Sequence, residues 1–382
     1  MGGFATHAIF GREILEEMKD TMLVSIIRKH QGVFGIGCQG PDLFLYNIAM
    51  LLSNEEKNLG IRMHREGSSR YFAWLLQSVW EEENVEAVEV GISYFYGLLS
   101  HYTLDSMLHP YVYARIGLDT SMPHAEKATS GLHHRLESAI DAKMIAVKED
   151  MLPSEYIPGG SIQISRQEKK ILARLLSKAV SRSYRIKLKE ENVLASIRMM
   201  KIIASGFFAA SEKQKEKLQK LEFPFMEDYG LTNFMVTNEY IQKRKIMNIE
   251  NCIWHNPWDK RIASNASVWE IYDAAMFQYQ KYCAVLEEVN PYFKRKWFAG
   301  ASPNTSYRHV RISDWQKGAK RVYKPKSSDI MKQVEEGSIN HLEENGKEEM
   351  SVKERISHVA KGLGNLSYES GLPLTGRKRA SA

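Results

Sequence analysis

The segment HYTLDSMLHPY, residues 101–111, carries three potential metal ligands at four-residue intervals: His101, Asp105 and His109. Each residue of an α-helix turns the chain by about 100°, so residues spaced by four stay on one face. Residues before a proline avoid the α region, so Pro110 predicts that the helix ends near Leu108 with His109 at its tip. Imidazole and carboxylate groups together suit zinc, so the spacing predicts a zinc site along this helix.

The segment HHRLESAID, residues 133–141, supplies a second pair at the same spacing, His133 and Glu137. His134 points about 100° away around the helix, although an i, i+3 pairing with Glu137 keeps it as an alternative ligand. Such a pair alone is weak evidence, because it also occurs as an ordinary surface contact. Beside the first segment it strengthens the prediction of a zinc site.

Two further residues are candidates because of where they lie. Asp42 in GCQGPDLFLYN begins a predicted helix just after Pro41, where an aspartate also interacts favourably with the helix dipole without any other role. His64 in GIRMHREG lies in a predicted short connection between two helices, and such connections often carry ligands. For His30 and His124 we expect ordinary surface or hydrogen-bonded core positions.

The composition is that of a soluble globular protein, with 43% hydrophobic and 26% charged residues among 382. The formal charge of +6 favours anionic partners. Cys38, Cys252 and Cys283 are far apart and odd in number, which argues against a disulfide framework and a thiolate zinc site. The N-terminal residues lack the apolar core of a signal peptide, and no apolar run reaches the roughly 20 residues that span a bilayer. We therefore expect a cytoplasmic protein.

Helical periodicity dominates the chain and predicts an all-α architecture. Breaks are predicted at residues 32–42, 152–161 and 290–306. Beyond residue 300 the chain is polar and lysine-rich. We therefore expect one multi-helix domain over residues 1–300 and an extension over residues 301–382 that forms docked helices or a partly mobile tail. The helices are expected near residues 7–19, 42–53, 67–82, 85–108, 123–148, 166–182, 190–209, 233–248 and 265–288.

Taken in chain order, the candidate residues form a longer pattern. It consists of THxxxG with His7, GPD with Asp42, MH with His64, HxxxD with His101 and Asp105, the following His109, and HxxxE with His133 and Glu137. This pattern resembles the bacterial zinc-dependent phospholipase C family, whose all-helical fold is also used by fungal single-strand nucleases. The resemblance implies that multi-helix fold and a cluster of two or three zinc ions.

The resemblance also implies which residues hold each ion. One ion would be held by Asp42, His64, His101 and Asp105, and a second by His109, His133 and Glu137. Asp105 would bridge to a third ion that also binds His7 and, in secreted members, the amino group and carbonyl of an N-terminal tryptophan. This chain begins Met1-Gly2 instead. If Met1 is removed, the amino group of Gly2 is a hypothetical substitute ligand.

The activity implied by the resemblance is hydrolysis of a phosphodiester, above all a phospholipid, by a zinc-activated hydroxide. Asp42 and Asp105 are the predicted catalytic carboxylates, and Asp42 is able to accept a proton from the attacking water. One alternative is a nuclease or nucleotide phosphodiesterase or phosphatase on the same fold, and another is a zinc-binding homologue without turnover. The basic segment 166–189, with Trp254 and Trp258, either contacts a membrane peripherally or forms an ordinary surface.

Overall fold

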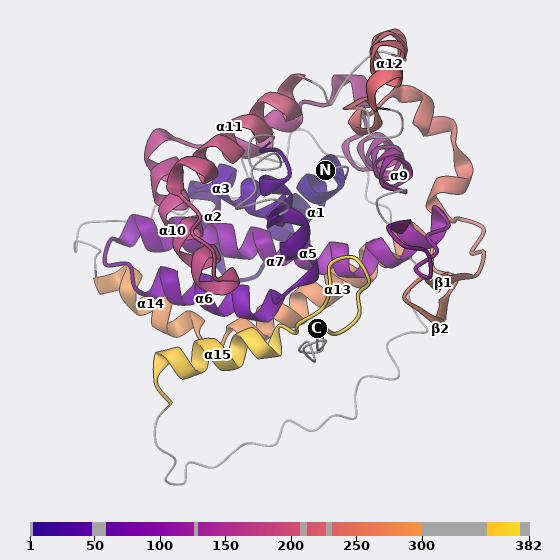
Figure 1. The fold of residues 1–382 in the computed structure, drawn as a ribbon. Helices are drawn as coiled ribbons and strands as arrows, with labels where there is room; N and C mark the ends of the chain where they lie inside the picture. The colour runs from indigo at the N-terminus through magenta and orange to yellow at the C-terminus, as the bar shows by residue number, and fades with distance from the viewer. Residues whose placement is uncertain are drawn as a thin grey trace.

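The computed structural model describes residues 3–47, 59–125, 129–206, 212–226, 231–299 and 350–374. These residues are mainly helical, and the predicted all-α fold is confirmed (Figure 1). The only sheet among them is an antiparallel hairpin of β1 (Trp254–Asn256) and β2 (Asp259–Ser264). The helices are α1 (Phe4–Glu17), α2 (Thr21–Lys29), α3 (Gln31–Cys38), α5 (Leu59–Arg65), α6 (Ser68–Trp80), α7 (Val85–Arg115), α9 (Ser130–Met144), α10 (Arg166–Tyr184), α11 (Glu190–Gly206), α12 (Glu212–Met226), α13 (Val268–Leu286), α14 (Asn290–Ala299) and α15 (Val352–Gly362).

Helix α7 runs through the middle of the molecule and is buried along most of its length (Figure 1). It packs against α1, α3, α6, α10 and α13. The prediction that this helix ends near Leu108 was wrong, because α7 continues through Pro110 to Arg115. Pro110 removes the N–H that would bond to the Ser106 carbonyl, but packing against neighbouring elements keeps the helix intact. His109 therefore stays on the helix shaft, one turn beyond Asp105.

The predicted break at residues 32–42 was wrong over α3, where glycines serve close packing instead of ending a helix. A Cβ atom on Gly37 would lie 2.4 Å from the Tyr94 carbonyl oxygen, and one on Gly97 would lie 2.2 Å from the Phe34 carbonyl oxygen. Only glycine permits such an approach of two helix backbones. The contact fixes the end of α3, at Cys38, against the part of α7 that carries His101.

Several other boundaries differ from the predictions. His64 lies within the short helix α5, not in a connection between helices. In place of a helix at 42–53 there is a 3-10 turn, Gly40–Phe44, and residues 48–53 lie outside the described part of the chain. The helix expected at 123–148 begins later, at Ser130, and after Met144 it continues as a π-helical turn to Glu149, close to the predicted end. The segment 233–248 forms short 3-10 turns, α14 occupies part of the predicted break at 290–306, and the hairpin at 254–264 was not predicted.

The described part of the C-terminal region, residues 350–374, docks on the helical body. Ser351 caps α15 by accepting a hydrogen bond from the Glu354 amide, and Ile356 and Val359 are buried. Helix α15 packs against α6 and α13. The predicted domain limit at residue 300 lies outside the described residues and stays a prediction. None of the described helices is long and apolar enough to cross a bilayer, and the cytoplasmic location also stays a prediction.

His30 joins three parts of the helical body through buried ion pairs, in agreement with its expected place in the core. Its Nδ1 lies 2.8 Å from Glu168 Oε1 on α10, and its Nε2 lies 3.2 Å from Glu89 Oε2 on α7. Burial alone would lower the pKa of His30, but these two carboxylates raise it above its ordinary value. The imidazolium form therefore stabilises the folded state.

Replacing His30 by alanine is expected to destabilise the protein by about 3 kcal/mol near pH 6, because it breaks a buried charge pair. The folded-state pKa lies above the unfolded value of about 6.5. The contribution of His30 to the free energy of unfolding is thus fully present below about pH 6.5 and is lost as the pH rises through the folded-state pKa. Thermal midpoints of both proteins across this range test the prediction. The alanine variant of the exposed His124 is the control, because its thermal midpoint should differ from that of the wild type by the same amount at every pH. A pH-independent difference for His30→Ala would contradict the prediction.

Candidate metal centre

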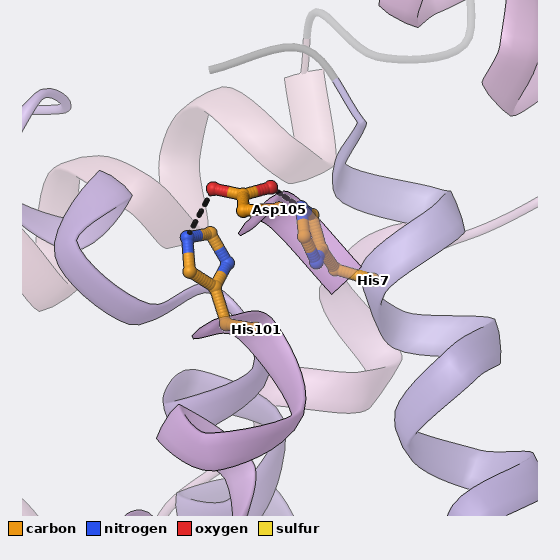
Figure 2. Close-up of side chains that lie close together, drawn as sticks. All are labelled: His7, His101 and Asp105. Carbon is orange, nitrogen blue, oxygen red and sulfur yellow. Dashed lines mark ion pairs between the residues drawn. The ribbon is translucent and has the colours of Figure 1, made fainter. Parts of the chain in front are cut away.

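Asp105 lies at the centre of the cluster, between histidines from two helices. His101 and Asp105 are one turn apart on α7, and His101 Nε2 lies 2.9 Å from Asp105 Oδ2. His7 on α1 stacks on the His101 ring, with ring centres 4.2 Å apart, and its Nε2 lies 3.0 Å from Asp105 Oδ1 (Figure 2). All three side chains are buried, with exposures of 5% or less. A single carboxylate thus faces two imidazoles, one with each oxygen.

Asp42 and His64 extend this group. His64 Nε2 lies 3.3 Å from Asp42 Oδ1 and 3.6 Å from Asp105 Oδ2. Gly40 makes room for the turn that carries Asp42: its φ is 49°, and a Cβ atom there would lie 2.4 Å from the His101 ring. The turn can therefore pass directly over His101 only because residue 40 is glycine.

A second group forms around Glu137. Its Oε1 lies 3.1 Å from His109 Nε2 and 3.1 Å from His133 Nε2. His134 contacts the other oxygen, with its Nδ1 3.3 Å from Glu137 Oε2. Among the described residues, potential ligand atoms within 4.8 Å of one another form three groups: His7 with His101 and Asp105, Asp42 with His64 and His101, and His109 with His133 and Glu137. His133, and not His134, belongs to the last group.

The chemistry of these residues fits a bound metal ion. Among the described residues, His101 Nε2 and Asp105 Oδ2 are buried and find no hydrogen-bond partner, although they lie 2.9 Å apart. The two atoms are thus close without being aligned for a bond to each other, as expected for ligands directed at a common point. A buried polar atom without a partner costs about 1–3 kcal/mol, which a cation would offset. Imidazole and carboxylate ligands without thiolate suit zinc.

Main-chain carbonyls fix the orientation of three histidines. The Nδ1–H of His64 donates to the Gly60 carbonyl at 2.7 Å. The Nδ1–H of His101 donates to the Cys38 carbonyl at 3.1 Å, and that of His109 donates to the Tyr368 carbonyl at 2.9 Å. A carbonyl only accepts, so the proton is on Nδ1 and the lone pair of Nε2 is available to a metal. Such contacts hold the ring of a metal ligand in place.

A family model described as zinc dependent phospholipase C matches residues 6–192. Residues 6–192 belong to the zinc-dependent phospholipase C family. Comparison with curated proteins and with solved structures finds no match. The family region contains every predicted side-chain ligand, from His7 to Glu137. The fold expected from the resemblance is thereby confirmed, and the assignment of individual ligands to individual ions stays a prediction.

The carboxylates of this zinc-dependent phospholipase C region are held in the ionised form that binds metals. Burial alone would raise the pKa of Asp105, but the surrounding imidazoles, above all that of His101, hold it well below its usual range. The pKa of Glu137 is lowered against burial in the same way, mainly by His133 and His109. The pKa of Asp42 also lies below its ordinary value despite burial, with His64 among the causes. These carboxylates are therefore available in the ionised form that a metal ion binds.

Asp141 is a supporting residue that the sequence analysis missed. Its Oδ1 accepts hydrogen bonds from the Thr6 amide at 2.8 Å and the Thr6 hydroxyl at 2.6 Å, and its Oδ2 accepts one from the Ala5 amide at 3.3 Å. It thus satisfies the free N–H groups at the start of α1, directly before His7. Burial raises its pKa to about 6. Its spacing was a usable signal, because Asp141 follows Glu137 by four residues and lies on the same face of α9.

The predicted ligand Gly2 lies outside the described residues, and its role stays a prediction. Its neighbour Gly3 lies beside the centre. A Cβ atom on Gly3 would be 3.5 Å from His7 Cδ2 and 3.8 Å from Glu137 Oε1. The start of the described chain therefore runs along both groups of ligands.

Proposed function

We propose that this protein hydrolyses a phosphodiester with zinc ions bound by its buried histidines and carboxylates. The observation that supports this most is the sharing of carboxylates: Asp105 faces His7 and His101, while Glu137 faces His109 and His133. Shared carboxylates suit neighbouring cations. The residues proposed to hold two or three zinc ions are His7, Asp42, His64, His101, Asp105, His109, His133 and Glu137.

Bound zinc lowers the pKa of water towards 7 and offsets negative charge on phosphoryl oxygens. Asp42, ionised and beside His64, is placed to accept a hydrogen bond from the attacking water and to orient it. A bond from the water oxygen to phosphorus then forms as the bond to the leaving oxygen breaks, and Asp42 takes up the water proton, which protonates the leaving oxygen. Histidines must be neutral to bind zinc, so activity should decline in acid.

A phospholipid is the substrate that we propose, in line with the family. Aromatic rings lie beside the second ligand group: the Tyr113 ring centre is 4.6 Å from that of His133 and 4.9 Å from that of Trp258. Such rings favour a quaternary ammonium headgroup by cation–π contact. They would also stack on a nucleobase, so single-stranded nucleic acid is the alternative substrate.

The basic helix α10 gives no support for membrane contact. Its Arg174 lies 2.6 Å from Glu82, and its Lys178 and Arg182 lie 2.7 Å and 2.9 Å from Glu81. The charges of these three side chains are therefore paired with carboxylates of the protein itself, as on an ordinary surface helix. Helix α10 is therefore not proposed as the surface that meets the lipid.

The test is hydrolysis by zinc-loaded protein of three substrates in parallel: bis-nitrophenyl phosphate, phosphatidylcholine vesicles and a single-stranded oligonucleotide. Release of phosphocholine and diacylglycerol is the expected result, and it should cease when a chelator removes the zinc. Cleavage confined to the oligonucleotide would support the nuclease instead. Full zinc content without any turnover would contradict an enzymatic role and support a zinc-binding homologue.

A further inference from the structure

Residues 363–374, which follow α15, lie against the helices that carry the metal centre (Figure 1). We call this segment the C-terminal strap. The Ser68 hydroxyl donates to the Leu366 carbonyl at 2.7 Å, and Arg65 pairs with Glu369 at 2.8 Å. These contacts tie the strap to α5 and α6, about 300 residues earlier in the chain. The strap lies outside the family region of residues 6–192.

Tyr368 of the strap contacts histidines from both ligand groups. Its amide donates to the His64 carbonyl at 3.0 Å, and its carbonyl accepts from His109 Nδ1 at 2.9 Å. Its ring is 1% exposed, and its centre lies 5.3 Å from that of His64 and 5.7 Å from that of His101. One residue thus fixes the orientation of His109 and covers His64 and His101.

The strap is closely fitted to α7. Gly371 has a φ of 64°, and a Cβ atom there would lie 2.3 Å from the Ser106 carbonyl oxygen and 3.3 Å from Pro110. Ser106 is the residue whose carbonyl loses its usual helical partner because residue 110 is proline. Asn256 holds the same part of the strap by donating to the Ser370 carbonyl at 2.8 Å. The C-terminal strap therefore packs against both α7 and β1.

We propose that the C-terminal strap completes the metal centre, with Tyr368 as a positioning residue for His109 and His64. The inference rests on the proposed zinc binding. The Tyr368 carbonyl holds the proton of His109 on Nδ1, which leaves Nε2 as the ligand facing Glu137. Groups that hold a ligand's second nitrogen raise metal affinity about 10- to 100-fold. The family region alone thus lacks one contact that its own histidine needs.

The test compares full-length variants by competition for Zn²⁺ with a chromophoric chelator. Tyr368→Ala removes the ring that anchors the carbonyl and is expected to weaken zinc binding about 10- to 100-fold. Tyr368→Phe keeps the ring and should retain wild-type affinity. Tyr279→Ala is the matched control, because Tyr279 is equally buried and bonds to the Tyr96 carbonyl, on a part of α7 that carries no ligand. It should lower the thermal midpoint and leave zinc affinity unchanged.

Wild-type affinity in Tyr368→Ala would overturn this inference and leave the proposed function standing. A wild-type protein that binds no zinc would overturn both. A second measurement needs no variant: if the strap supports zinc, zinc must stabilise the strap to the same extent. Hydrogen exchange of residues 363–374 should therefore slow when Zn²⁺ is added, and by a larger factor than in residues 166–184 of α10, which carry no ligand and respond only through the stability of the whole folded state. Unchanged exchange in the strap would also overturn the inference.

Discussion

Replacing Asp105 by alanine is expected to strip more than one zinc ion from each chain and to reduce hydrolysis by more than about 10³-fold. Its two oxygens face His7 and His101 at 3.0 Å and 2.9 Å, and His64 lies 3.6 Å away. Loss of one electrostatic stabiliser commonly costs about 10²- to 10³-fold in rate, and Asp105 contacts histidines of two of the three groups of ligand atoms. Elemental analysis after dialysis gives the zinc content, and bis-nitrophenyl phosphate gives the rate.

Asp273→Ala is the matched control for this experiment. Asp273 is an exposed carboxylate on α13, and its removal should change neither zinc content nor rate. A loss of a single zinc ion in Asp105→Ala would show that Asp105 is an ordinary ligand and does not bridge. Full zinc content would contradict its role in the centre altogether.

Local spacing predicted the parts of the centre that lie on one helix. His101, Asp105 and His109 share a face of α7 because helix geometry alone sets the direction of residues four apart. The same holds for His133 and Glu137 on α9. The approach of His64 to Asp42 depends instead on how α5 and the 3-10 turn at Gly40–Phe44 pack, which no local pattern encodes. There the family resemblance, and not the spacing, supplied the prediction.

The role of Tyr368 and the short turns at residues 233–248 were not predicted, because both depend on contacts between distant parts of the chain. Tyr368 acts through its main-chain carbonyl, 259 residues from His109, and any residue type carries such a carbonyl. The apolar period of residues 233–248 predicted a helix, but side chains from elsewhere bind the carbonyls that a helix would use. Lys143 donates to the Ile241 carbonyl, and the Tyr111 hydroxyl donates to the Ile246 carbonyl at 2.6 Å. Tertiary contacts thus favoured short turns over the intrinsic helical tendency.

Withdrawing zinc is expected to lower the thermal midpoint by roughly 10 °C or more, because without cations the buried carboxylates and imidazoles of the centre lose their shared partner. A ligand at about 1,000 times its Kd stabilises the folded state by about 4 kcal/mol per site. In a protein of this size, each kcal/mol corresponds to roughly 1–2 °C, so two or three sites together give a shift of roughly 10 °C or more. Calorimetry of zinc-loaded and chelator-treated protein at one pH measures the shift, and added zinc should restore it.

Two controls separate specific binding from a general effect of cations. Mg²⁺ prefers oxygen ligands in octahedral geometry, so it should not restore the midpoint of the chelator-treated protein at a centre rich in imidazole. The Asp105→Ala variant should show a much smaller response to zinc than the wild type, because it loses the carboxylate that faces His7, His101 and His64. An equal response of the two proteins would place the stabilising zinc elsewhere, and a midpoint indifferent to the chelator would contradict zinc binding in the folded state.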